Sequence, residues 1–140
     1  MQVEWLILAD SAQVVGNKLF IMGGGWDRLT VNKEFPTERR VGIALAIKVP
    51  WNRTNERHEF EIEIASEDAA TVAKVGGNFE VGRPAGIPPG QDQRVQLAVE
   101  TTLKFERPGT FVIVAKLDGK EGQRVPFHVM SGAGAPIPGG

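Results

Sequence analysis

Histidine and serine are the side chains with which this chain could perform acid–base or nucleophilic chemistry, and it has few of them. His58 and His128 are the only histidines, and both fall in segments predicted to be strands. A metal site there would need carboxylates brought from elsewhere, so we interpret both as hydrogen-bonded strand residues. Ser11, Ser66 and Ser131 lack the sequence of a nucleophile elbow. We therefore predict no catalytic residues and expect that the protein is not an enzyme.

Three consecutive glycines, Gly23 to Gly25, have the composition of a phosphate-binding loop. The lysine-hydroxyl pair of such loops does not follow them, and the sequence predicts no helix whose N-terminus would hold an anion. We interpret them as serving backbone geometry and close packing beside Trp26, with positive φ at one position or more. No cofactor-binding residues are predicted.

Five carboxylates fall at predicted turns, where clustered oxygens bind calcium in some β-sandwich proteins. Their spacing matches no calcium loop, so we predict no metal site and interpret them as solvated, turn-forming acids. They are Asp10, Asp27, Glu67, Asp68 and Asp118.

The tryptophans offer a different chemistry, because exposed indole rings stack on sugars. Trp5 lies in an apolar run and is predicted to be core, whereas Trp51 follows Pro50 at a strand end and is the best candidate for exposure. The chain then has five candidate residues for ligand or partner contact: Trp51, Asn52, Arg53, Arg83 and Pro84. A small-ligand or carbohydrate-binding module using Trp51 and the Gly82–Gln93 loop is the alternative function.

The segments that would position these residues are short and strand-like. The clearest has His58 and three apolar residues on one face and three glutamates on the other, a period of two that is typical of a half-buried strand. Gly16-Asn17 and Asp118-Gly119 are typical of two-residue hairpin turns. With eight or nine strands at regular spacing, the sequence predicts an all-β, antiparallel β-sandwich of immunoglobulin/fibronectin-like type.

Several details of the strands are also predicted. Asp10–Gln13 is expected to turn, Glu34–Arg40 to connect strands, and Gly76-Gly77 to interrupt a strand pair at Val72–Val81. Gly42, Ala44 and Ala46 alternate with the apolar residues of 41–49 and are small, so that face is expected to lie close to a neighbouring element. The predicted core is Trp5, Leu6, Leu8, Leu19, Ile43, Leu45, Ile47, Phe60, Ile62, Ile64, Leu97, Val99, Phe111, Ile113 and Phe127.

Composition limits the class of protein. The 140 residues fit one domain, predicted at 1–130, followed by a disordered Gly/Pro-rich tail at 131–140. A net charge of -1 gives no reason to expect nucleic acid or an anionic membrane as partner. The absence of cysteine excludes disulfides and fits a reducing compartment. No long apolar segment is present, so we expect a cytoplasmic protein.

Several motifs resemble a family of small uncharacterised bacterial proteins. The resemblance implies a single β-domain over most of residues 1–130, and because that family has no assigned activity it supplies no catalytic residues. It is carried by Leu8–Val15, Gly16-Asn17-Lys18-Leu19, Gly23-Gly24-Gly25-Trp26-Asp27, Val49-Pro50-Trp51-Asn52, Phe79–Pro84, Pro108-Gly109 and Pro126-Phe127.

The function expected from the sequence is that of a non-catalytic β-sandwich for protein interaction or assembly. Its partner would be a protein, with a homo-oligomer as one form and a small ligand as the alternative. An unprotected edge strand or a flat apolar patch would favour this function. Exposed tryptophans gathered at one end of the sandwich would favour the ligand-binding alternative.

Overall fold

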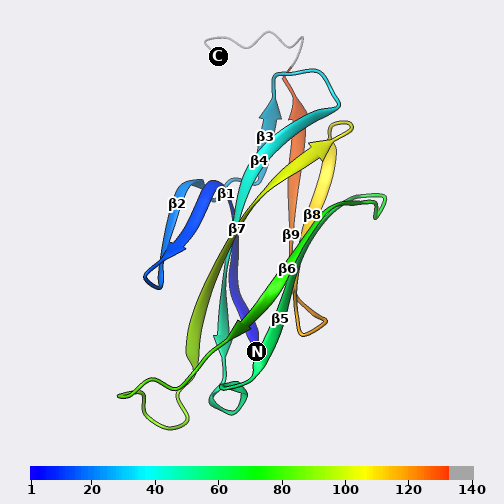
Figure 1. Ribbon diagram of the computed structural model, residues 1–140. Coiled ribbons are helices and arrows are strands. Elements are labelled where there is room, and N and C mark those ends of the chain that lie inside the picture. The colour runs from blue at the N-terminus through cyan, green and yellow to red at the C-terminus, as the bar shows by residue number, and fades with distance from the viewer. Residues whose placement is uncertain (133–140) are drawn as a thin grey trace.

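A computed structural model describes residues 1–132, which form nine strands and one short 3-10 helix, η1 (Figure 1). None of the helices in this part of the chain is long and apolar enough to cross a membrane. The elements are β1 Gln2–Val15, β2 Lys18–Gly24, β3 Arg28–Val31, β4 Thr37–Val49, η1 Trp51–Arg53, β5 Arg57–Ser66, β6 Thr71–Glu80, β7 Gln93–Phe105, β8 Gly109–Leu117 and β9 Lys120–Ser131.

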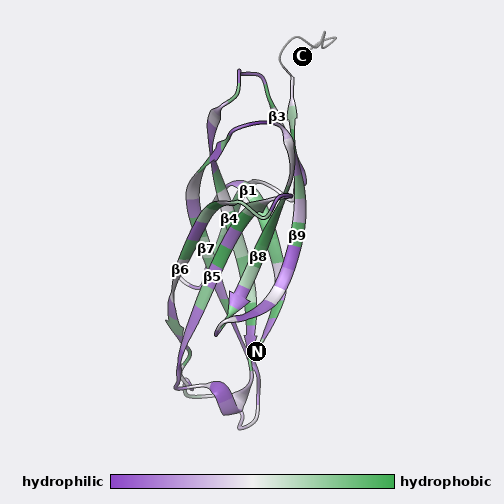
Figure 2. Cartoon of the chain, turned by 90° about the vertical axis from the view of Figure 1, so that its right-hand side faces the viewer, coloured by the Kyte–Doolittle hydropathy of each residue, from purple (hydrophilic) through white to green (hydrophobic). Residues whose placement is uncertain are grey.

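The strands form two sheets, with the orders β2-β1-β4-β7 and β3-β9-β8-β5-β6. All neighbours are antiparallel except β3 and β9, which are parallel. Apolar side chains from both sheets meet in one core, and Figure 2 shows the hydrophobic residues along the middle of the strands. The all-β prediction is confirmed, and the core lies between the two layers.

Ten of the fifteen predicted core residues are buried, among them Ile43, Leu45 and Phe127. Five are only half-buried: Trp5, Leu19, Phe60, Leu97 and Val99. The prediction also missed buried residues such as Leu103 and Phe105.

Two predicted hairpins are confirmed. Gly16 and Asn17 join β1 to β2 with φ of 58° and 61°, and Asp118 and Gly119 join β8 to β9 with φ of 48° and 80°. Positive φ at both central residues matches the twist of the flanking strands. Gly23 also has positive φ, as predicted for the glycine run.

Other details differ from the prediction. Residues 10–13 do not turn but continue β1, and the predicted strand pair at 72–81 is the single strand β6. Strand β4 already begins at Thr37, inside the predicted connection. Strand β9 reaches Ser131, which pairs with Val31, so Ser131 belongs to the sheet and not to the predicted tail; residues 133–140 lie outside the described part.

The outer face of the first sheet is covered by its own chain. In its first half, up to Ala9, β1 pairs with β4; from Ala9 onwards it pairs with β2 and crosses over that face. A Cβ on Gly42 would lie 2.7 Å from the backbone nitrogen of Ala12, and Ala44 and Ala46 are fully buried there. The prediction that this small-residue face meets a neighbouring element is confirmed at Gly42, where the neighbour is the second half of β1.

Polar bonds fix this hairpin to β7. The Glu100 carboxylate accepts bonds from the Ser11 hydroxyl, at 2.6 Å, and from the Ala12 backbone N–H, at 3.3 Å. The Ser11 bond, followed by that of Arg40, holds the pKa of Glu100 below its usual range. Nearer the turn, the Gln96 amide donates to the Asn17 carbonyl at 3.2 Å. The hairpin is therefore held at both ends.

Truncating the core should reveal the difference between buried and half-buried phenylalanines. Phe127 is fully buried, so Phe127→Ala should lower the free energy of unfolding by about 3–5 kcal/mol. Phe60 is half-buried, so Phe60→Ala should cost less. Chemical denaturation measures both, and an equal loss would contradict this description of the core.

Adding one methyl group should separate the hairpin from the sheet. Gly42→Ala places a Cβ against the backbone of Ser11 and Ala12, which cannot give way as a side chain can, so we expect a clear fall in melting temperature. Gly82→Ala is the matched control, because its nearest neighbour is 3.8 Å away and its φ is not positive. Similar melting temperatures for the two variants would contradict close packing at Gly42.

Candidate functional site

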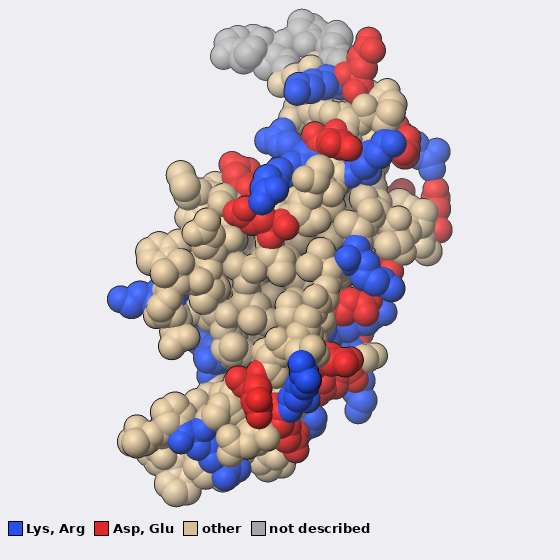
Figure 3. Space-filling model, in the orientation of Figure 1, with Lys and Arg blue, Asp and Glu red and all other residues tan. Residues whose placement is uncertain are grey.

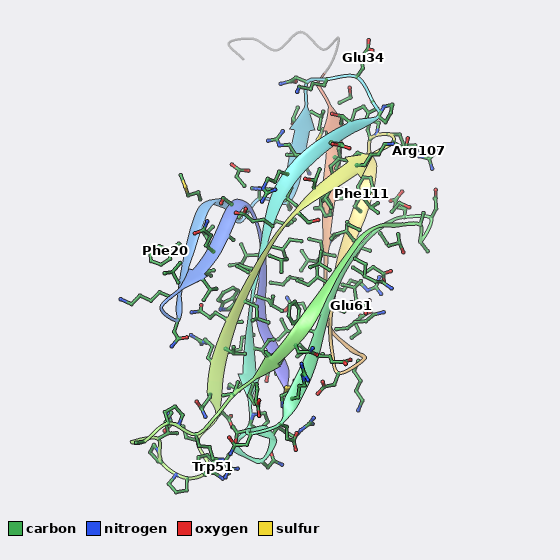
Figure 4. The ribbon with its side chains drawn as sticks, in the orientation of Figure 1. Phe20, Glu34, Trp51, Glu61, Arg107 and Phe111 are labelled. Carbon is green, nitrogen blue, oxygen red and sulfur yellow. The ribbon has the colours of Figure 1, made fainter. Side chains whose placement is uncertain are left out.

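The predicted contact residues lie where η1 meets the loop between β6 and β7, at the lower end of the molecule in Figure 4, where Trp51 is labelled. The guanidinium of Arg83 lies 3.9 Å above the centre of the Trp51 ring and donates to the Trp51 carbonyl at 2.9 Å. It also donates to the Thr54 hydroxyl at 2.6 Å. Trp51 is therefore half-buried, and one face of its ring is already occupied by Arg83.

The other three predicted contacts lie beside this pair but differ in what they do. Asn52, in η1, and Pro84, directly after Arg83, are exposed. Arg53 is half-buried and forms ion pairs with Glu56, at 2.9 Å, and with Asp118, at 3.2 Å. Its cationic group is thus engaged within the chain.

Beneath them lies a buried histidine with two partners. His58 is 1% exposed, its Nδ1 lies 2.8 Å from Asp118 Oδ2, and its Nε2 lies 2.7 Å from the Arg53 carbonyl. The ring packs against Phe79, 5.4 Å away between centroids. The interpretation of His58 as a hydrogen-bonded strand residue is confirmed.

Asp118 was predicted to be a solvated turn acid, and this was only half correct. It forms the turn, but its carboxylate also accepts the Glu59 backbone N–H at 2.8 Å and faces His58. Burial acts to raise the pKa of Asp118. The bonds from Glu59 and His58 and the charge of Arg53 outweigh burial, so the pKa lies below its usual range.

The three tryptophans do not gather at one end. Trp26 packs edge-on against Phe127 at 6.4 Å and belongs to the rim of the core. Trp5 pairs with Ala46, whose side chain is not part of the core cluster, so Trp5 lies on the outer face of the first sheet. The arrangement that would favour a sugar-binding surface is therefore not present in residues 1–132.

A cavity of about 500 Å³ opens near the upper end, between the β5–β6 and β7–β8 turns. Figure 4 shows Phe111 and Arg107 there, and Arg107 forms an ion pair with Asp68 at 2.7 Å across these two turns. The lining also contains Lys104, which lies 3.7 Å from Glu106, and a third acid, Glu67. Because both cations of the lining are paired with acids of the lining, the cavity favours no single ligand class.

A different surface is formed by strand β2, residues 18–24, which we call the β2 edge. Phe20 and Met22 are 56% and 74% exposed and lie opposite Gln13 and Ser11 on one face of the hairpin. Val15, 59% exposed, extends the same face. Figure 4 shows Phe20 projecting from the hairpin, far from Trp51, and Figure 3 shows this side of the molecule largely free of charge.

Sequence reasoning missed this surface. Leu19 to Met22 is a continuous apolar run, so it lacks the alternation that tells an exposed face from a buried one. The sequence signal that could have found it is the face of small residues on β4. Small residues indicate that another element lies on this face, so one side of that element, here the β1–β2 hairpin, is covered and its other side faces solvent.

No group of three or more histidines and acids within residues 1–132 is arranged to hold a metal ion. Two of the three glutamates on the wet face of β5, Glu61 and Glu63, instead face basic neighbours. Lys74 lies 3.4 Å from Glu61, and Lys116 lies 3.9 Å from Glu63.

The Asp118 carboxylate should stabilise the fold in a pH-dependent way. Because its pKa is lowered by folding, its contribution is present at neutral pH and is lost as the pH falls through the lowered value. Asp118→Asn tolerates the same positive φ but lacks the charge, so its melting temperature should be lower than wild type at pH 7. The gap should close well below about pH 4. Thermal melts across pH measure this, and a gap that persists undiminished at about pH 2 would contradict it.

Comparison with known proteins is consistent with the resemblance to a family without an assigned activity. No curated protein matches the chain. One family model does, and it covers residues 4–130, which include every strand except the ends of β1 and β9. The chain therefore belongs to the family described as "Family of unknown function (DUF6941)".

Proposed function

We propose that this protein is a non-catalytic interaction or assembly subunit, and that it binds another protein by adding a strand to the β2 edge. An edge strand presents unpaired N–H and C=O groups, which a second extended chain satisfies by continuing the sheet. The observation that carries the proposal is the combination of a free edge with the exposed apolar side chains of Phe20 and Met22.

A comparison of the four edge strands in the described residues supports the choice of β2. Strand β7 carries Arg94, Glu100 and Lys104, and β6 carries Lys74 and Glu80, charges of the kind that protect an edge. Strand β3 is only four residues long and begins with an arginine. Strand β2 has one charge, at its first residue, and its central residues have none.

The overall surface agrees with this proposal. Exposed large apolar side chains in the described residues are few, and three of the four are on the β1–β2 hairpin. Clusters of this kind usually mark contact sites. The hairpin is also held in place by Glu100 and Gln96, so little order would have to be gained on binding.

The alternative, a small-ligand module using Trp51 and the Gly82–Gln93 loop, has weaker support. A ligand stacking on the covered face of Trp51 would have to displace Arg83 and break its bonds to Thr54 and the Trp51 carbonyl. The closing β8–β9 hairpin is compatible with the immunoglobulin/fibronectin-like type of sandwich, which we retain as part of the proposal.

Site-specific photo-crosslinking tests the proposed function. A benzophenone-bearing phenylalanine analogue replaces Phe20 in the full chain, and ultraviolet light is applied in the cells that naturally make the protein. We expect a discrete adduct with a protein. The control is the same analogue at Lys104, an exposed position on the charged β7 edge. No adduct at position 20, or equal labelling at both positions, would overturn the proposal.

A further inference from the structure

We infer that the partner at the β2 edge is a second copy of this chain, and that two β2 strands pair antiparallel about a two-fold axis at Ile21. This rests on the proposed function, because it identifies the partner of the same surface. The paired edges would join the two first sheets of the two copies into one continuous sheet.

Symmetry limits the ways in which two β2 strands can pair. A two-fold axis perpendicular to the sheet reverses the strand direction but keeps each side chain on its own face. Opposed residues must therefore come from the same face. This requires that one residue of β2 lies opposite its own copy across the axis, and this residue is the centre of the register. The central candidates are Phe20, Ile21 and Met22.

Of these registers, only the one centred on Ile21 pairs all seven residues of β2. It sets Phe20 of each copy opposite Met22 of the other, so that the two most exposed apolar side chains of the strand cover each other twice. Centring on Phe20 would oppose Met22 with Lys18, and centring on Met22 would oppose Phe20 with Gly24. Cross-strand apolar pairs stabilise a sheet, so Ile21 is the favoured centre.

The charges of the hairpin are also self-complementary. Lys18 lies at the turn end of β2, and Asp10 lies at the opposite end, where its carboxylate occupies the space that a Cβ on Gly23 would take. Neither residue forms an ion pair within the part of the chain that the structure describes. Antiparallel pairing brings Lys18 of each copy to the end that carries Asp10 of the other. Parallel pairing would bring the two lysines together.

A second copy of the chain also supplies a partner for the β2 edge of each of the two chains. A foreign strand would occupy one β2 edge and needs its own apolar partners for Phe20 and Met22. A two-fold pair uses the same surface on both chains and leaves no β2 edge free, so the assembly closes as a dimer.

Single cysteines test both the dimer and its register, because the natural chain has none and each introduced thiol is the only one. Under mild copper-catalysed oxidation, Ile21→Cys should form a disulfide-linked dimer, since its two Cα atoms lie within disulfide range across the axis. Phe20→Cys and Met22→Cys should each crosslink poorly alone, because identical residues are diagonal neighbours, but should crosslink with each other when mixed. Both positions are exposed, so these variants should fold.

Light scattering over a concentration series provides the independent readout: the wild-type mass should approach twice that of the chain. A monomer at every concentration, a dimer without the β2 crosslinks, or efficient crosslinking of Phe20→Cys alone would each overturn the inference.

The photo-crosslinking experiment then separates the two proposals. An adduct at position 20 with a different protein supports the proposed function and contradicts the dimer, whereas the absence of an adduct contradicts both.

Discussion

The close approach of two backbones at Gly42 determines much of this structure. Strand β4 is one of the two inner strands of the first sheet, and its outer face carries Gly42, Ala44 and Ala46, so another layer can lie directly on it. The second half of β1 uses this space and carries β2 with it. Without that contact the β1–β2 hairpin would extend into solvent as an isolated two-stranded ribbon, which is marginally stable at best. The position of the β2 edge depends on this contact.

Much of the fold could be predicted because local rules and the final structure agree. The alternation around His58 identifies a strand with one wet face, and Gly16-Asn17 and Asp118-Gly119 identify turns that only a few residue types adopt. The predicted turn at residues 10–13 was wrong because the polar residues there lie within strand β1 and form hydrogen bonds to another strand. The Ser11 hydroxyl and the Ala12 backbone N–H both donate to the carboxylate of Glu100, a residue 89 positions away from Ser11 in the chain. The residues around Ser11 give no indication of a partner so far away in the chain.

The candidate site was less predictable than the fold. The sequence correctly grouped Trp51 with Arg83, but it suggested an open ring where the structure has a covered one, because a cation above an indole depends on loop geometry. The exposed face of Phe20 and Met22 was invisible, since an apolar run looks the same whether one or both of its faces are covered. Which face is wet depends on the position of the whole hairpin over β4.

Strand β1 crosses from one layer to another, and its two halves should therefore differ in how often they open. The first half pairs with β4 and contributes Val3, Leu6 and Leu8 to the core, so its amide protons should exchange with solvent only when the whole domain unfolds. The second half contributes no residue to the core cluster and is held by the contact at Gly42 and by polar bonds to β7, so we expect it to open more often than the first half. We therefore expect this one continuous strand to belong to two cooperative units, with the boundary near Ala9, where β1 changes partners from β4 to β2.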